Sequence, residues 1–220
     1  MVPNQSRSRA AAYAIACVVA AALFAWLGLN VTRNGEPAWL LPPERALEGH
    51  SALIAWWLTW SCYIYVLAPV AIILLLLAWR FPAWRGRILF SIVMLVLCWQ
   101  GADFFQHMFA RPRRLDWIVK HEQAFSYPSS HAAIATGFYA VWGVMLLLSE
   151  LPSVTRKVAG VLLVLFAIAI CWARLALGAH YVTDIVGGAL LAVALVCAGL
   201  AIVSAIFRVA VAGRVYEAAE

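Results

Sequence analysis

The sequence has few charged residues. Asp, Glu, Lys and Arg make up 12% of its 220 residues, whereas soluble domains average about a quarter. Hydrophobic residues make up 65%, and several apolar runs reach the roughly 20 residues that cross a bilayer. The composition excludes an ordinary soluble protein and predicts an all-α integral-membrane bundle. The length fits one compact bundle, so we expect a single domain over residues 1–220.

Cysteine pairs with disulfide or metal-site spacing are also lacking. The five cysteines are Cys17, Cys62, Cys98, Cys171 and Cys197. Their number is odd, they lie inside apolar runs, and no C-x-x-C pair occurs, which excludes a disulfide framework and a cysteine metal site. They are expected to be small buried hydrophobic residues. The sequence has no carboxylate cluster suited to Mg²⁺ either.

Acidic residues are fewer than basic ones, and the formal net charge is +6. In a soluble protein such an excess would suggest nucleic acid. Here much of it is explained by arginines in cytoplasmic loops, which set the orientation of a membrane protein. We therefore expect a lipid bilayer and no nucleic acid as the partner.

Six apolar runs predict six membrane-spanning helices. They cover about residues 10–29, 52–79, 89–109, 129–148, 158–175 and 182–207. The first run is too long for the apolar core of a signal peptide, so it is interpreted as a span that follows a flexible cytoplasmic N-terminus at residues 1–9. A short interfacial helix is expected within residues 30–51.

Basic residues indicate which side of the membrane each loop faces. Six spans place both termini on one side, together with basic turns at residues 80–88 and 149–157, and the positive-inside rule assigns this side to the cytoplasm. In a bacterial inner membrane the loops at residues 30–51, 110–128 and 175–181 are then external. The loop at 110–128 is basic too, and an anionic substrate would explain its charge.

The outer end of the third span carries polar residues, namely Gln100, Asp103, Gln106 and His107. Polar groups at this depth are costly in lipid, so we expect them to face the bundle interior or a water-filled cavity. Asp103 and His107 would either line the inner wall of a site or make a structural contact between helices.

Two short motifs open the polar region. Arg111, followed by a proline, offers a planar fork of donors that suits phosphate oxygens, although an arginine that snorkels to lipid headgroups is the alternative. Ser129 and Ser130 begin the fourth span, where a helix N-terminus favours anions, and His131 would lie in its first turn. The alternative is an ordinary capped helix with an incidental histidine.

The third set of polar residues is Arg174, His180 and Asp184. His180 and Asp184 are four residues apart and share a helix face, so the carboxylate can fix the imidazole tautomer and leave the other nitrogen as a nucleophile or base. An interfacial ion pair between Arg174 and Asp184 is the alternative, but it leaves His180 unexplained.

Taken together, these motifs resemble the type 2 phosphatidic acid phosphatase (PAP2) superfamily in order and spacing. The matching residues are Arg111, Pro112, Pro128, Ser129, His131, Arg174, His180 and Asp184. Three positions differ from the family pattern. Phe104 stands where the first motif usually has lysine, Ser130 replaces a glycine, and Ala173 replaces a serine. Either Gln106, Arg113, Arg114 or Lys120 would then compensate for the missing lysine, or the substrate would need less charge.

The resemblance implies a mechanism and a site. His180 would attack phosphorus to form a phosphohistidine, Asp184 would orient the imidazole, and His131 would act as general acid and then as base. Phosphate oxygens would be held by Arg111, Arg174, Ser129 and Ser130, with no metal and no cofactor. The substrate would be a membrane lipid phosphate, such as a polyprenyl diphosphate, phosphatidylglycerol phosphate, phosphatidic acid or a lipid A phosphate.

Two other functions stay open at this point. A phosphotransferase of the same superfamily would share the phosphohistidine and pass the phosphoryl group to another acceptor. A non-enzymatic transporter would use Asp103, Gln106 and His107 for an ion path. The polar residues gather at one membrane face and do not line a path across the bilayer, which favours the phosphatase.

Overall fold

The computed structural model describes residues 3–114, 124–149 and 153–217, and every regular element in these ranges is a helix. The elements are α1 (Pro3–Asn34), α2 (Leu41–Leu47), α3 (Ala52–Trp60), α4 (Ile64–Arg80), η1 (Pro82–Trp84), α5 (Arg85–Phe109), α6 (Ser130–Ile134), η2 (Ala135–Ala140), α7 (Val141–Leu147), α8 (Ser153–Ala176) and α9 (Val182–Glu217). The predicted all-α fold is confirmed.

Six membrane spans account for these helices. Five described helical stretches are long and apolar enough to cross a bilayer, and α3 with α4 makes a sixth if the bent pair is one span. The fourth span joins α6, the π-helical η2 and α7 without a break, from Ser130 to Leu147. The protein is therefore a multi-pass membrane protein, as the apolar runs predict.

The second span differs from the continuous helix expected at residues 52–79. Its two halves meet at an angle of 45°. Ser61 Oγ donates to the Leu58 carbonyl at 2.6 Å, and Tyr63 adopts an extended conformation (φ −84°, ψ 152°) before α4 begins. An extended residue interrupts the ladder of i→i−4 hydrogen bonds, so the chain turns at residues 61–63.

The first helix also differs from the expectation, because α1 begins at Pro3 and the described residues of the N-terminal segment are helical. The short interfacial helix expected within residues 30–51 is present as α2. The expected external loop at 110–128 is described only at residues 110–114 and 124–128.

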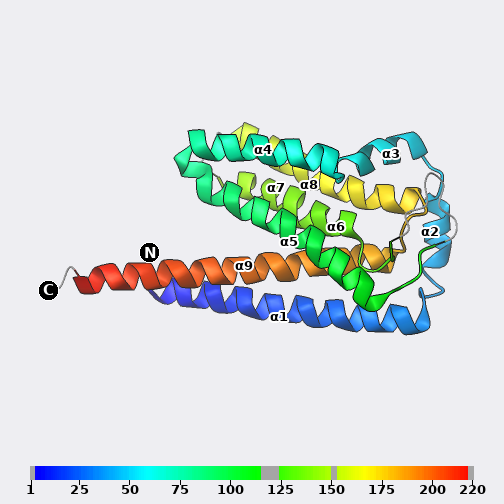
Figure 1. Cartoon of the computed structure of the whole chain (residues 1–220), viewed down its shortest axis with the longest axis horizontal. Helices are drawn as coiled ribbons and strands as arrows, with labels where there is room; N and C mark the ends of the chain where they lie inside the picture. Colours follow the sequence, from blue (N-terminus) through cyan, green and yellow to red (C-terminus); the bar gives the residue numbers. More distant parts are fainter. Residues whose placement is uncertain (1–2, 115–123, 150–152, 218–220) are drawn as a thin grey trace.

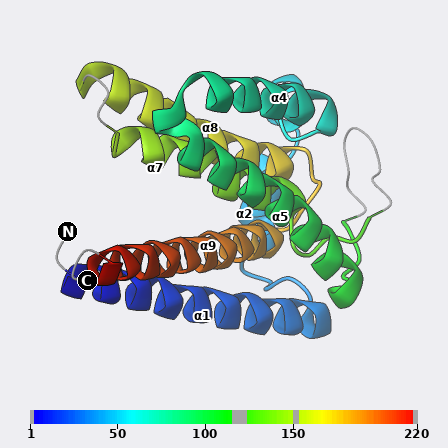
Figure 2. The same ribbon diagram turned by 60° about the vertical axis from the view of Figure 1, so that its left-hand side comes forward.

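The long helices run roughly along the long axis of the molecule and form two groups (Figures 1 and 2). Helices α1 and α9 pack side by side over much of their length, and the other group contains α3, α4, α5, the α6–α7 span and α8. Both termini lie at one end of the molecule. The opposite end carries α2 and the connections that lead into α6 and α9, so it gathers the segments that hold the candidate site residues.

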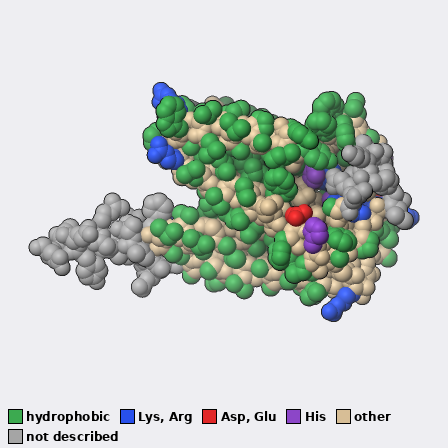
Figure 3. Space-filling view, viewed as in Figure 1, with side chains coloured by type: hydrophobic (Ala, Val, Ile, Leu, Met, Phe, Trp, Pro, Cys, Tyr) green, Lys and Arg blue, Asp and Glu red, His purple; other side chains and the backbone are tan. Residues whose placement is uncertain are grey.

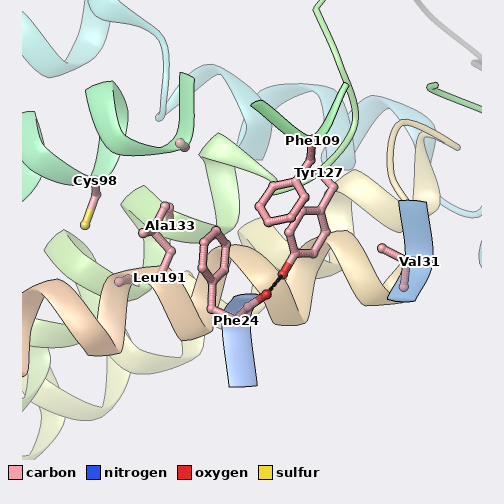
Figure 4. Packing of buried hydrophobic residues seen from close by; sticks show 9 residues of the cluster. Phe24, Val31, Cys98, Phe109, Tyr127, Ala133 and Leu191 are labelled. Carbon is pink, nitrogen blue, oxygen red and sulfur yellow. Dashed lines mark hydrogen bonds between the residues drawn. The ribbon is translucent and has the colours of Figure 1, made fainter. Parts of the chain in front are cut away.

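An aromatic cluster anchors the segment that precedes α6. The Tyr127 side chain is fully buried and lies between the rings of Phe24 and Phe109, 5.5 and 5.1 Å away between centroids. Its hydroxyl donates to the Phe24 carbonyl at 2.7 Å (Figure 4). These contacts fix the start of α6 to both α1 and α5.

Helices α6 and α9 approach each other closely at a glycine. A Cβ atom at Gly188 would lie 2.3 Å from the Ser129 carbonyl oxygen, far inside van der Waals contact. The backbone of Ser129 also donates to the Asp184 carbonyl at 3.0 Å. The first turns of α6 and α9, which carry His131 and Asp184, are thus fixed beside each other through backbone contacts.

The surface is apolar where lipid would cover it. Figure 3 shows hydrophobic side chains over the middle of the face that carries α4 and α5, with Lys and Arg at its ends. In α5, Gln106 is buried as expected, but Gln100, Asp103 and His107 are exposed. These three do not face the bundle interior, because the buried face of α5 is formed by apolar residues together with Ser91 and Gln106.

Candidate active site at the outer end of the bundle

Four elements bring the polar motifs together. His131 lies in the first turn of α6, Arg174 in the last turn of α8, and His180 in the connection between α8 and α9. Asp184 lies in the first turn of α9, where a helix dipole favours a carboxylate. The side chains of Arg174, His180 and Asp184 are fully buried, and His131 is 5% exposed.

The Asp184 carboxylate orients the His180 ring. Its Oδ2 lies 3.4 Å from His180 Nδ1 and accepts hydrogen bonds from the Tyr181 N–H, at 3.0 Å, and from the Ser126 hydroxyl. Because a carboxylate can only accept, the network assigns the proton to Nδ1 of His180 and leaves the lone pair on Nε2. This is the arrangement that a nucleophilic imidazole needs.

Arg113 lies on the other side of the His180 ring. Its Nη1 is 3.1 Å from His180 Nε2 and 3.2 Å from the Ala179 carbonyl, and its Nε donates to the Ala124 carbonyl at 2.6 Å. Burial, and then the nearby Arg113 cation, lower the pKa of His180 to about 4. The imidazole is therefore neutral near pH 7.

His131 is the second histidine of the site. Its ring interacts electrostatically with Arg174, His180 and Arg113, and it stands edge-on to the Tyr63 ring, 5.4 Å between centroids. The backbone of Thr59, near the end of α3, also approaches the ring. The break between α3 and α4 thus supplies a wall for a buried imidazole that is available for proton transfer.

Arg111 lies behind Asp184. Its Nη1 donates to Asp184 Oδ1 at 2.6 Å and to Thr183 Oγ1 at 2.8 Å, and its Nη2 donates to Glu36 Oε2 at 2.9 Å. Its guanidinium carbon also lies 4.3 Å from the Tyr181 ring centroid. Burial alone would lower the pKa of Arg111, but the two carboxylates raise it. Arg111 was expected to bind phosphate, but in this structure it binds the carboxylates of Asp184 and Glu36.

The two serines that open the fourth span have different environments. Ser129 is fully buried and caps α6, since its hydroxyl accepts from the Ala132 N–H at 3.4 Å. Its own N–H donates to Asp184, as described above. Ser130 is half-buried at the first position of α6, where backbone N–H groups point out of the helix end.

The four residues expected to compensate for the missing lysine have different surroundings. Gln106 donates to the Pro128 carbonyl at 2.8 Å, and Arg114 pairs with Glu44 at 3.3 Å and with Glu48. Arg113 reaches His180, whereas Lys120 lies outside the described residues. Phe104, at the position of the family lysine, is 62% exposed on α5.

Two acidic residues between α1 and α3 complete the site, although sequence reasoning did not identify them. Glu44 Oε1 accepts from the Val182 N–H at 2.7 Å, and Glu36 Oε1 accepts from the Thr183 N–H at 3.3 Å. They satisfy N–H groups of the first turn of α9. Burial, and then the nearby Glu36, raise the pKa of Glu44 to about 7.

A signal for these two residues was present in the sequence. The segment at residues 30–51 carries several glutamates and the segment at residues 110–128 carries several arginines, so charge complementarity between the two segments could have paired them. A metal site has no comparable support, since no group of three or more His, Cys, Asp or Glu residues in the described ranges could hold an ion.

The arrangement combines groups that phosphoryl transfer requires: an oriented neutral imidazole, a second imidazole for proton transfer, and arginines beside both. A positioned nucleophile with an orienting carboxylate makes covalent catalysis feasible. Cationic donors stabilise the charge that develops on the transferred group. The helix ends that carry these groups, in α6, α8 and α9, lie toward the end of the bundle opposite the two termini.

Comparison with known proteins gives the family. Residues 87–208, more than half of the chain, match the model of the PAP2 superfamily. No curated protein matches the sequence. Among solved structures, the chain is similar to a transmembrane PAP2-type phosphatidylglycerolphosphate phosphatase from Bacillus subtilis, with 20% identity and a TM-score of 0.67 over 87% of this chain and 94% of that one. The chain belongs to the PAP2 superfamily.

Proposed function

We propose that this protein is a membrane lipid phosphatase, with one membrane-embedded domain over residues 1–220. It hydrolyses a phosphate monoester or diphosphate of a lipid through a phosphohistidine intermediate. The observation that carries this proposal is the His180 ring, whose Nδ1 faces Asp184 while Nε2 faces the Arg113 cation. Family membership and the likeness to a phosphatase fold support it.

In the first step, the Nε2 lone pair of His180 attacks phosphorus. A P–N bond forms as the P–O bond to the lipid oxygen breaks, and that oxygen keeps the bonding electron pair. A protonated His131 ring gives its proton to the same oxygen, so the lipid leaves as an alcohol or, from a diphosphate, as a monophosphate. Asp184 stabilises the positive charge that His180 acquires.

In the second step, water attacks the phosphohistidine. The neutral His131 ring takes a proton from that water, and the P–N bond breaks with its electron pair returning to Nε2 of His180. Orthophosphate leaves, and both histidines regain their starting states. General acid–base help of this kind is worth about 10²–10⁴ in rate, and a bound phosphate dianion beside His131 favours the protonated ring.

Arginine carries the charge stabilisation in this proposal, and no metal is required. Arg174 is buried beside both histidines and binds equatorial oxygens, together with backbone N–H groups at the start of α6. A planar guanidinium matches the geometry of phosphate oxygens. We place the site at the external face of a bacterial inner membrane, because the basic turns at residues 80–88 and 149–157 lie at the other ends of the spans.

The headgroup is identified with a substrate panel. The purified protein in detergent is given a polyprenyl diphosphate, phosphatidylglycerol phosphate, phosphatidic acid and a lipid A phosphate, each with EDTA, and orthophosphate release is measured. We expect release from at least one of them. His180→Ala abolishes it, because the nucleophile is lost.

His50→Ala is the control, because His50 is exposed on the connection between α2 and α3 and its loss leaves release unchanged. Release that survives His180→Ala, or that requires Mg²⁺, contradicts the mechanism. Loss of lipid phosphate without orthophosphate release, with the phosphoryl group found on an added acceptor, identifies a phosphotransferase in place of a hydrolase.

A further inference from the structure

The two arginines of the Arg111-Pro-Arg113 segment face opposite sides of the His180 ring. Asp184 contacts Nδ1 of the imidazole, and Arg111 contacts the far oxygen of the same carboxylate. Arg113 contacts Nε2. Because the two nitrogens lie on opposite sides of the imidazole, Arg111 is behind the nucleophile and Arg113 is in front of it.

Arg111 is committed to its present position by charge. It is 3% exposed and forms ion pairs with Glu36 and Asp184, which are themselves 2% and 0% exposed. Moving its guanidinium to a phosphate would leave two buried carboxylates without their cation, which is strongly unfavourable. Arg111 therefore acts as a positioning residue for Asp184.

Arg113 occupies the space that the phosphoryl group must enter. A phosphorus atom poised for attack lies about 3–3.5 Å from the nucleophilic nitrogen, and the Arg113 Nη1 atom is itself 3.1 Å from that nitrogen. The Arg113 Nε donates to the Ala124 carbonyl, and its Nη1 also donates to the Ala179 carbonyl, next to His180. The guanidinium is thus anchored within reach of any phosphoryl oxygen that approaches Nε2.

Attack requires the hydrogen bond between Arg113 and His180 to be exchanged. While Nη1 donates to Nε2, the lone pair that attacks phosphorus is engaged. A phosphate oxygen is a stronger acceptor for guanidinium than a neutral imidazole, because both partners of the new hydrogen bond are charged. Binding of the phosphoryl group therefore draws the donor from Nε2 and frees the lone pair.

We propose that Arg113 is the catalytic guanidinium that binds the transferred phosphoryl group, and that it hydrogen-bonds Nε2 of His180 until the phosphate takes up that hydrogen bond. This deepens the proposed phosphatase function and rests on it. Arg113 and Arg174 then hold the phosphoryl group, while Arg111 holds the carboxylate that orients the nucleophile.

The test compares Arg113→Gln, Arg113→Lys and the control Arg45→Gln, which removes an exposed guanidinium from α2 at the same end of the molecule. On the substrate that the wild type hydrolyses, Arg113→Gln lowers kcat/KM by about 10²–10³-fold, as loss of one transition-state donor does. Arg113→Lys keeps the charge without the planar fork, so its kcat/KM lies between those of Arg113→Gln and the wild type. Arg45→Gln matches the wild type.

A pH profile separates this role from a structural one. Removing the Arg113 cation raises the pKa of His180, so the acid limb of kcat/KM in Arg113→Gln moves to higher pH, whereas Arg113→Lys keeps the wild-type limb. A purely structural loss lowers the whole profile without moving it. An unchanged profile together with wild-type kcat/KM in Arg113→Gln overturns the proposal.

A binding measurement tests Arg113 without turnover. Orthophosphate is titrated into each variant with ¹⁵N-labelled histidine, and the His180 signal is identified by its loss in His180→Asn. Arg113→Gln weakens orthophosphate binding by about 10–100-fold, the contribution of a hydrogen bond between charged groups. If no lipid phosphate is hydrolysed but this dependence is found, the phosphatase proposal fails and the anion site stands. Equal binding in wild type and Arg113→Gln overturns the anion site.

Discussion

The Asp184 carboxylate accepts hydrogen bonds from several donors at once. Arg111 binds Oδ1, while His180, the Tyr181 N–H and the Ser126 hydroxyl approach Oδ2. With both oxygens held from different directions, the carboxylate cannot rotate without breaking charge-assisted hydrogen bonds. The orientation of the His180 ring is therefore set by the residues around Asp184.

Replacing Asp184 with asparagine tests this at the level of one atom. Asp184→Asn puts an NH₂ group where an acceptor is needed, so the imidazole takes the wrong tautomer and kcat falls by up to about 10⁴, as for the orienting carboxylate of a catalytic triad. Asp103→Asn, on the exposed face of α5, keeps wild-type kcat. Both are measured by orthophosphate release, and equal rates for the two variants would contradict the assignment.

The sequence predicted which residues meet at the site better than it predicted their partners. Spacing of four residues placed His180 and Asp184 on one face, and they are in contact. The arginine–proline motif assigned Arg111 to phosphate, yet its guanidinium binds Glu36 and Asp184. A motif gives the residue types, but the side on which a long flexible arginine lies depends on carboxylates that are distant in sequence.

At the scale of elements, the first turns of α6 and α9 meet through backbone atoms. Gly188 allows the Ser129 carbonyl to approach α9, and Gly187 makes room for the Tyr127 ring, since a Cβ there would lie 2.2 Å from it. Small residues allow this close approach between membrane helices. The separation of the two histidine-bearing segments is therefore set by glycine.

Gly188→Ala should separate these two helices. The added Cβ meets a carbonyl oxygen at 2.3 Å, and backbone cannot yield as a flexible side chain does, so we expect a loss of about 1–3 kcal/mol in the free energy of unfolding. Orthophosphate release falls with it. Unfolding is followed in detergent by circular dichroism against denaturant.

Gly86→Ala is the matched control for this substitution. Gly86 is also helical, near the start of α5, and a Cβ there meets nothing within 4 Å. Alanine in a helix is favoured over glycine by about 0.5–1 kcal/mol, so stability stays equal or rises. If both variants unfold at the same denaturant concentration as the wild type, the contact at Gly188 does not set the helix spacing.

Hydropathy predicted the spans well but not the bend in the second one. The run at residues 52–79 is apolar apart from Thr59 and Ser61, so its hydropathy gives no sign of an interruption at residues 61–63. The break follows from the Ser61 hydroxyl bonding to its own helix and from the extended Tyr63 backbone. The exposure of Gln100, Asp103 and His107 on α5 was not predicted either, because hydropathy does not say which face of a helix its neighbours cover.

At the scale of the whole molecule, the segments at residues 30–51 and 110–114 carry opposite charges that pair with each other. Glu36, Glu44 and Glu48 from the first segment pair with Arg111 and Arg114 from the second. Sequence reasoning attributed the basic charge of the second segment to an anionic substrate alone. Part of that charge is instead matched inside the protein, and Glu44 also accepts from the Val182 N–H, which ties α2 to the start of α9.

Glu44 makes the stability of this connection depend on pH. Its pKa rises from 4.5 to about 7 on folding, so the stability from its protonated form is present below pH 4.5 and is lost as pH rises to about 7. His180, lowered from 6.5 to about 4, has the opposite slope: its contribution is present above pH 6.5 and is lost as pH falls through 4. The two partly cancel in the wild type.

Glu44→Gln removes the contribution of Glu44 to the pH dependence of folding stability. In melting experiments between pH 4.5 and 7, the variant gains stability with rising pH relative to the wild type, because only the His180 contribution remains. Arg45→Gln, the exposed neighbour, changes neither slope. Parallel curves for Glu44→Gln and wild type would show that Glu44 does not titrate in this window.

The contact at Gly188 also limits how such a protein can diversify. The spacing between the segments that carry His131 and His180 is set by main-chain atoms, which point substitutions of side chains do not resize. In the proposed phosphatase, a different headgroup would then be accommodated elsewhere, and the bend at residues 61–63 is the candidate wall, since Tyr63 faces His131 from there. Variants selected for a different headgroup should accumulate changes around this bend and leave the glycine contact intact.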